Sequence, residues 1–234
     1  MDLTALMQQL LTTVQGWWPA GAVQPVALPA GLDTTHLMAI AAALGWASGL
    51  RLYAVVFLTG LMGALGWVVL PNGLQLLQNP LVLAAAGAML AVEFLADKIP
   101  GLDSLWDMVH TVIRIPAGAA LAGAVFGGDQ SSWALIAALL GGTLAATSHV
   151  AKATTRAAVN TSPEPFSNIG LSLLGDLTVP AMLWLAWEHP LAFTVCLVIA
   201  LVVMLALTVV LMKFLKALIR SLRQRVGGGV AAGA

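Results

Sequence analysis

Ionisable and polar residues recur at helical spacing inside stretches of this chain that are otherwise apolar. Glu93 and Asp97 are four residues apart, and Asn168, Ser172 and Asp176 repeat that spacing. Two further stripes have members three or four apart: Asp103, Asp107, His110 and Arg114 in one, and His149, Lys152 and Arg156 in the other. Such residues share one face of a helix. A charge that faces hydrocarbon costs about 2.5 kcal/mol or more, so these faces predict a membrane bundle with a polar interior.

The two carboxylates Glu93 and Asp97 are the sharpest pair. Carboxylates one helical turn apart could bind a cation, share a proton or pair with a basic residue of a neighbouring helix. The alternative is that Asp97 lies hydrated at the membrane surface and has no chemical role.

The stripe from Asp103 to Arg114 favours ion pairing as structure, with Asp107 or His110 next to Arg114. Carboxylates with a histidine could also bind a divalent metal. No spacing in the stripe fixes a coordination geometry, so the metal question stays open. We include Asp103, Asp107 and Arg114 among the candidate binding residues, together with Asn168 and Asp176.

The basic face of His149, Lys152 and Arg156 is suited to binding an anion or phosphate. Long basic side chains near a helix end also extend to the membrane surface without binding anything, and this alternative fits Arg156 best. Arg51 follows Gly49 near the middle of a long apolar stretch. Because neither membrane surface is close to it, Arg51 is the basic residue that we interpret most readily as functional.

Composition places the chain in a membrane. Of 234 residues, 60% are hydrophobic and 9% are charged, whereas about a quarter of the residues of a soluble domain are charged. The formal net charge of zero gives no basic surface for nucleic acid. The single cysteine, Cys196, excludes a disulfide within the chain and a cysteine-rich zinc site. No phosphate-cradling loop is present, and we predict no cofactor.

The predicted fold is an all-α integral membrane bundle, since a crossing helix needs roughly 20 apolar residues. Six stretches qualify: 36–70, 80–97, 104–127, 131–158, 166–187 and 190–213. The first is too long for one straight crossing. It is either steeply tilted and kinked or broken near Gly49, and two complete crossings are the alternative.

Three regions follow from this division. Residues 1–34 are predicted to form an amphipathic interfacial helix and a linker rich in proline and glycine, and residues 35–213 the transmembrane bundle. Residues 214–234 are predicted to continue the last helix as a basic cytoplasmic extension that frays into a disordered tail from residue 227. Its basic face should meet anionic lipid headgroups of the bilayer. That face consists of Lys213, Lys216, Arg220 and Arg223.

The loop charges predict the orientation. Lysine and arginine gather at Lys98, at the end of the fourth stretch and in the C-terminal extension, and such residues mark the cytoplasmic side. Six crossings would then place both termini in the cytoplasm of a bacterial inner (plasma) membrane. The same six would allow two inverted three-helix repeats, as in many transporters.

Several strings resemble a known bacterial membrane family, the one catalogued as domain of unknown function 4126. They are GLRLY at 49–53, EFLADKIPGLD at 93–103 with Trp106 and Asp107, SHVAK at 148–152, Arg156, Asn160, SPEP at 162–165 and Asn168. The resemblance covers about residues 38–178. It implies a multi-spanning membrane protein whose biochemical role is not settled, and no catalytic residue is carried over.

Three functions fit these patterns. The first is a small secondary transporter or flippase whose unknown solute, ion or lipid is held by Arg51, Glu93, His149 and Lys152, with proton coupling through Glu93. The second is a non-enzymatic scaffold or regulatory module. The third is a membrane-embedded enzyme, with Ser48 as nucleophile and a histidine as base. Transport predicts a continuous polar cavity near the midplane, and a scaffold predicts neutralised charges with no void.

Overall fold

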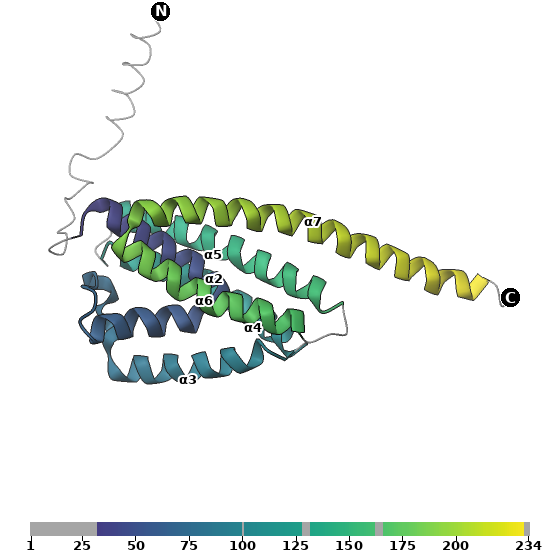
Figure 1. Ribbon diagram of the computed structural model, residues 1–234, viewed down its shortest axis with the longest axis horizontal. Helices are drawn as coiled ribbons and strands as arrows, with labels where there is room; N and C mark the ends of the chain where they lie inside the picture. The colour runs from purple at the N-terminus through teal and green to yellow at the C-terminus, as the bar shows by residue number, and fades with distance from the viewer. Residues whose placement is uncertain (1–31, 100, 128–131, 162–165, 232–234) are drawn as a thin grey trace, which may run out of the picture.

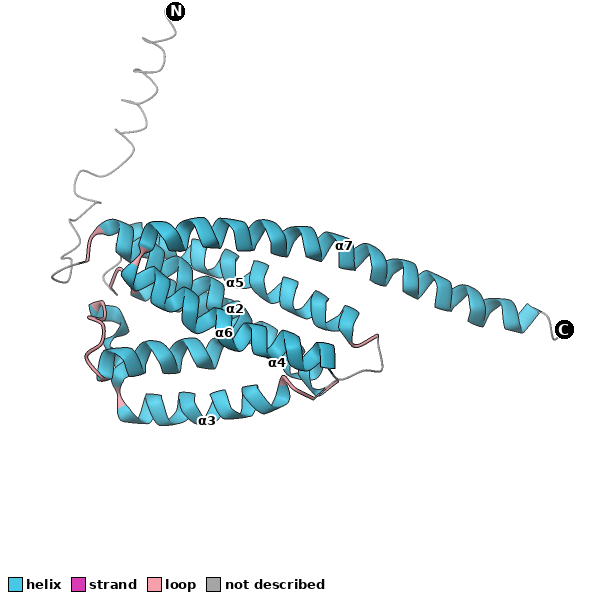
Figure 2. Ribbon diagram, viewed as in Figure 1, coloured by secondary structure: helices cyan, strands magenta, loops and turns pink. Residues whose placement is uncertain are grey.

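The computed structural model describes residues 32–99, 101–127, 132–161 and 166–231, and every regular element within those ranges is a helix (Figures 1 and 2). The predicted interfacial helix lies outside the described residues. In the described part, four helices are long and apolar enough to cross a membrane. They are α2 (Thr34–Ala64), α5 (Ser132–Val159), α6 (Phe166–Glu188) and the first 32 residues of α7 (Pro190–Ala231). The expected six crossings are therefore not confirmed, and neither is the repeat.

Three further helical elements complete the bundle. The short 3₁₀ helix η1 (Asn72–Gln78) meets α3 (Pro80–Ala96) at 70°, and only together do they satisfy the same test of length and apolarity. The last, α4 (Leu102–Ala124), carries charges along its length. Helix starts follow the sequence signals: the Asn79 side chain accepts a hydrogen bond from the Leu81 amide at 2.9 Å, and proline occupies the first turn of α3.

The predicted break in the first apolar stretch lies at Arg51, whose φ of −148° and ψ of 82° interrupt α2. Before the break, Gly45 lies against Gly141 and Gly49 against Ala145, so this half of α2 runs in the same direction as α5. After the break, the second half of α2 packs against a different neighbour, helix α3. Phe57 lies against Gly87 of α3, and Gly60 against Leu77 and Leu83.

The second half of α2 therefore runs antiparallel to α3. Helices α3 and α5 both run toward one cluster of charged residues, in which Arg156 lies 3.2 Å from Asp97. The first half of α2 is parallel to α5 and runs toward this cluster, whereas the second half is antiparallel to α3 and runs away from it. The second half therefore returns toward the end of the bundle where α2 began. The first apolar stretch is thus a bent pair of helices with its tip at Arg51, as the purple and blue segments in Figure 1 show. Thr34 and the C-terminal end of α7 lie at opposite ends of the bundle.

The polar faces predicted from helical spacing are buried, and the apolar faces are exposed. On α4, Asp107 and Arg114 are at most 2% exposed, whereas Met108 and Val112 are 68% and 78% exposed. A helix in water has the opposite arrangement. Apolar residues outside and charges inside are what a hydrocarbon solvent requires, which supports a membrane location.

Away from the charges, the bundle is packed through apolar and small side chains. Leu37, Leu70, Phe126 and Phe193 belong to one buried core. A Cβ built on Gly45 would overlap the backbone of Gly141, which shows how closely α2 and α5 approach. The small residues at spacing four predicted this close contact.

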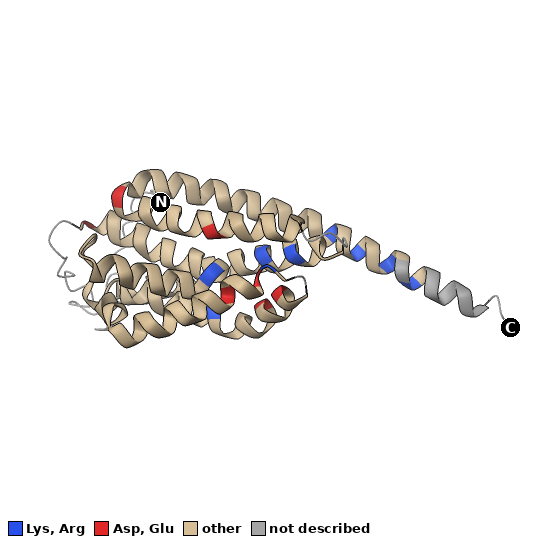
Figure 3. Cartoon of the chain, turned by 60° about the horizontal axis from the view of Figure 1, so that its bottom comes forward, with Lys and Arg blue, Asp and Glu red and all other residues tan. Residues whose placement is uncertain are grey.

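The last helix, α7, is 42 residues long and extends well past the other helices (Figure 1). It continues to Ala231, beyond residue 227 where we expected it to fray, and residues 232–234 lie outside the described part. Its predicted basic residues are exposed along the projecting part, in blue in Figure 3: Lys213, Lys216, Arg220 and Arg223.

Candidate functional site

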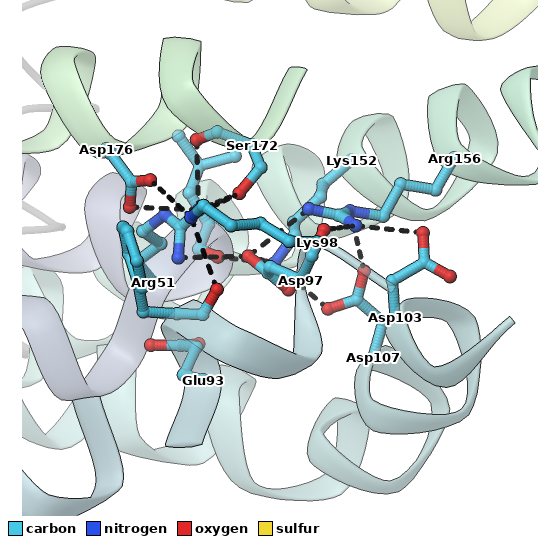
Figure 4. A network of polar contacts seen from close by, with 12 residues as sticks. Arg51, Glu93, Asp97, Lys98, Asp103, Asp107, Lys152, Arg156, Ser172 and Asp176 are labelled. Atoms are coloured by element: carbon cyan, nitrogen blue, oxygen red, sulfur yellow. Dashed lines mark hydrogen bonds and ion pairs between the residues drawn. The ribbon is translucent and has the colours of Figure 1, made fainter. Parts of the chain in front are cut away.

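Ten charged side chains meet at the end of the bundle from which α7 projects (Figures 3 and 4). We call them the charge network. It contains five acids and five bases: Glu93, Asp97, Asp103, Asp107, Asp176, Arg51, Lys98, Arg114, Lys152 and Arg156. The chain has ten residues of each sign, so the network holds half of its charges, and its formal charges cancel.

Asp97 is the centre of the charge network. Its carboxylate lies 3.0 Å from Arg51, 3.2 Å from Lys152 and 3.2 Å from Arg156, and it is fully buried. These cations come from two different helices, α2 and α5. The alternative of a hydrated surface carboxylate at Asp97 is therefore wrong.

Arg51 projects from the break in α2 and connects α3 to α6 (Figure 4). Besides Asp97, it pairs with Asp176 at 3.0 Å and donates to both the carbonyl and the hydroxyl of Ser172 at 3.0 Å. Lys98 lies 3.3 Å from the other oxygen of Asp176. Each of the two carboxylates that hold Arg51 thus has a second cationic partner.

A second branch of the network is centred on Arg114. Its guanidinium lies 2.6 Å from Glu93 and 2.6 Å from Asp107, which confirms the predicted pairing within α4. Asp107 is also 3.0 Å from Lys152, which joins this branch to Asp97. The Glu93 Oε2 atom is buried and has no hydrogen-bond partner among the described residues.

Arg156 joins α5 to the start of α4. It lies 2.8 Å from Asp103 and 3.4 Å from the Asn168 side-chain oxygen, and Asn160 donates to Asp103 at 3.0 Å. Arg156 is 3% exposed. The expectation that it extends to the membrane surface is therefore wrong, because three carboxylates within reach stabilise its charge inside the bundle.

His149 borders the network without carrying one of its ion pairs. Its Nε2 lies 2.7 Å from the Thr111 hydroxyl, and its Nδ1 lies 3.5 Å from Arg114. Thr111 donates its own proton to the Asp107 carbonyl. The hydroxyl is therefore free to accept a hydrogen bond from an Nε2–H of His149.

Two cavities lie on either side of Arg51. The first, about 280 Å³, lies between α5, α6 and α7 and is lined by Arg51, Asp97, Lys152 and Arg156 at its polar end. The second, about 530 Å³, lies between α2, α3 and α6 and is lined by Arg51 and Asp176. The remaining walls of both are almost entirely apolar. Two cavities that share Arg51 thus take the place of the continuous polar cavity expected for transport.

All eleven candidate residues lie together. Nine belong to the charge network, and His149 and Asn168 contact it through Arg114 and Arg156. Sequence reasoning assigned Lys98 to the membrane surface, named Ser172 for its spacing but not as a binding residue, and left Thr111 out. Ser172 was detectable, because it lies midway between Asn168 and Asp176 on one helix face.

The serine nucleophile and the metal site considered from the sequence find no supporting contacts in the described residues. The Ser48 hydroxyl donates to the Leu44 carbonyl at 2.6 Å, and no bond to a histidine is observed there. No group of three histidine, cysteine or acidic side chains in that part of the chain could hold a metal ion.

Residues 38–213 match the model of a protein family described as Domain of unknown function (DUF4126). The chain belongs to this family. The matched range contains the whole DUF4126 charge network and both cavities. Neither a curated protein nor a solved structure matches the chain.

Proposed function

We propose that this DUF4126 protein is a small secondary transporter or flippase of the bacterial inner membrane. The observation that carries the proposal is the position of Arg51. It lies at the tip of a broken helix, lines both cavities, and is held by Asp97 on one side and Asp176 on the other. A substrate would pass from one cavity to the other when Arg51 exchanges these partners.

The network makes such an exchange inexpensive. When Arg51 leaves Asp97, that carboxylate keeps Lys152 and Arg156, and when it leaves Asp176, that carboxylate keeps Lys98. An unpaired buried charge costs several kcal/mol. Because neither carboxylate is left unpaired, the exchange does not incur the free-energy cost of an unpaired buried charge.

Glu93 is our proposed proton-coupling group. Its Oε1 binds Arg114, whereas Oε2 is buried without a hydrogen-bond partner in the described part of the chain. A proton on Oε2 would neutralise Glu93 while Arg114 keeps its pair with Asp107. Protonation could therefore change the balance of the network without leaving Arg114 alone.

A second candidate function, a scaffold or regulatory module, is favoured by one observation: the five acids and five bases neutralise each other. The two cavities beside Arg51 argue for transport instead, since a scaffold has no need of a void next to its ion pairs.

A vesicle assay separates the two functions. The purified protein is reconstituted in liposomes, and translocation of a fluorescently labelled phosphatidylglycerol is measured by chemical quenching from outside. We expect faster translocation than in protein-free liposomes. Arg51→Lys keeps the charge but loses the planar guanidinium that contacts Asp97 and Asp176 through separate nitrogens. It should slow translocation by about tenfold for each 1.4 kcal/mol of lost interaction.

The matched control for this assay is Ser172→Ala, which removes one acceptor of Arg51 and leaves its ion pairs. It should retain most of the activity. If the wild-type protein, shown to be inserted, translocates no faster than empty liposomes, the flippase form of the proposal fails.

The orientation that we propose differs from the one expected for six crossings. The basic α7 extension supports a cytoplasmic C-terminal side. The return of α2 at Arg51 supports a location of Thr34 and η1 on the opposite side. Cysteine labelling in a Cys196→Ser background tests this: Thr34→Cys should react in intact cells, where six crossings would leave it protected, and Gln224→Cys should react only after permeabilisation. Labelling of both from the same side would exclude this topology.

A further inference from the structure

We propose that the cavity between α5, α6 and α7 binds an anionic amphiphile, with its acidic headgroup at the charge network and its acyl chain along the helices. The inference rests on the proposed function, because it names the substrate class of the same site. Three observations carry it: the walls, the polar end and one unpartnered donor.

The walls of this cavity are apolar and reach the outer surface of the bundle. Leu174 of α6 and Val203 and Leu207 of α7 line it, and they are 61%, 49% and 46% exposed. In a bilayer, such residues face lipid tails. The volume of about 280 Å³ is close to the lower end of the range of about 300–1,000 Å³ found for small-molecule sites. A chain can therefore enter sideways from the membrane.

The polar end of the cavity presents more cations than carboxylates. Among the charged lining residues, the exposed fraction of the side chain is 10% for Lys152, 4% for Arg156 and 2% for Arg51. It is 0% for Asp97, which forms ion pairs with all three (Figure 4). The network is neutral as a whole, but the charged residues that line this cavity are three cations and one carboxylate. This excess of cations attracts an anionic group through charge-assisted hydrogen bonds.

Trp46 adds a donor that lacks an acceptor. Trp46 is among the residues that line the cavity and is 1% exposed, and its Nε1–H has no hydrogen-bond partner among the described residues. An indole nitrogen only donates. A buried donor without a partner costs about 1–3 kcal/mol, and an oxygen of a phosphate or carboxylate would remove that cost.

The shared chemistry is an acidic oxygen group attached to a chain. It could come from a phospholipid phosphate or a fatty-acid carboxylate. A soluble anion has the headgroup chemistry alone and leaves the apolar walls unused. The experiment therefore compares these sources directly.

The test is a lipid count by native mass spectrometry on the full-length protein. The background is a variant in which Lys213, Lys216, Arg220 and Arg223 are glutamine, so that the α7 extension does not contribute anionic binding. Phosphatidylglycerol, oleate, phosphatidylcholine and inorganic phosphate are titrated separately. We expect one tightly bound anionic lipid, with at least about tenfold preference over phosphatidylcholine.

Two matched variants locate the site. Val203→Trp places bulk in the cavity and should reduce binding of phosphatidylglycerol by about tenfold. Val202→Trp, on the same helix at 62% exposure and outside the lining, should leave it unchanged. Trp46→Phe removes the indole donor and should weaken binding by a few fold, by the loss of one hydrogen bond to a charged group.

Three outcomes overturn the inference. Equal binding of phosphatidylglycerol and phosphatidylcholine excludes anion selectivity, and inorganic phosphate that binds as tightly and displaces the lipid makes this a free-anion site. A Val203→Trp protein that folds and binds normally excludes the cavity. A protein that binds phosphatidylglycerol selectively but does not translocate it refutes the proposed function and leaves this inference intact.

Discussion

The two ends of the bundle are stabilised by different means. Around Gly45 and Gly141, helices meet backbone to backbone. Around Asp97, helices are connected by ion pairs of long side chains, and two cavities remain between them. The comparison shows that the close helix packing and the ion pairs that can exchange partners lie at different places along the bundle. The apolar end should be sensitive to added volume, and the charged end to lost charge.

The largest effect is expected when the centre of the charge network is removed. Asp97→Asn leaves Arg51, Lys152 and Arg156 with one carboxylate fewer, and loss of one partner of a buried pair costs about 3–5 kcal/mol. The matched change Asp176→Asn, at a side chain that is 19% exposed, should cost about 1 kcal/mol or less. Unfolding in detergent, followed by circular dichroism, gives both values. Equal losses would show that Asp97 is not the centre.

Added volume should break the other end. Gly45→Val would push a side chain into the Gly141 backbone, which cannot move away, and such overpacking costs about 1–3 kcal/mol. Gly170→Val is the control, since a Cβ there meets nothing within 4 Å. The same unfolding measurement should show a loss only for Gly45→Val. If Gly170→Val is equally destabilising, helix propensity rather than close packing explains the effect.

A smaller effect should separate the two members of the Glu93–Arg114 pair. Glu93→Gln leaves Arg114 paired with Asp107 and should cost about 1.5 kcal/mol, the value of one hydrogen bond to a charged group. Arg114→Gln should cost more, because Glu93 then loses its ion-pair partner at full burial. Comparison of the two unfolding free energies checks this order. The reverse order would show that Glu93 has another cation in reach.

The smallest effect on unfolding is expected at the α7 extension, which touches neither end. Replacement of Lys213, Lys216, Arg220 and Arg223 with glutamine should leave the unfolding transition unchanged. It should weaken insertion fidelity and association with anionic headgroups by about 1 kcal/mol for each charge. Vesicle binding at several fractions of phosphatidylglycerol measures the loss. If the variant instead loses translocation at unchanged membrane level and orientation, the extension belongs to the transport mechanism.

Sequence reasoning identified the faces but not their partners. Helical spacing predicted that Asp103, Asp107 and Arg114 share a buried face, because spacing depends only on residues three and four apart. The partners of Asp97 depend on packing over long distances: Lys152 and Arg156 are 55 and 59 residues away in the chain. Local periodicity holds no information about that distance, so the burial of Arg156 was missed.

The path of the chain was predictable only in part. Gly45, Gly49 and the length of the first apolar stretch indicated a break, and the break is at Arg51. The reversal of direction was considered only as the alternative of two crossings, because it depends on which neighbours the second half of α2 meets. The expected six crossings are not confirmed, because α4 is not among the candidate spans of the described residues and α3 qualifies only together with η1.

One contact at this break bears on the order in which the protein is made. Lys152 donates to the Leu50 carbonyl at 3.0 Å, across 102 residues of chain, and so satisfies a backbone oxygen beside the residue that interrupts α2. A ribosome delivers α2 long before α5. The nascent α2 segment therefore enters the membrane without the Lys152 ammonium that supports its bend. Its final shape is reached only after α5, which carries Lys152, has been synthesised. Chains that stop before α5 should hold this segment in a different topology.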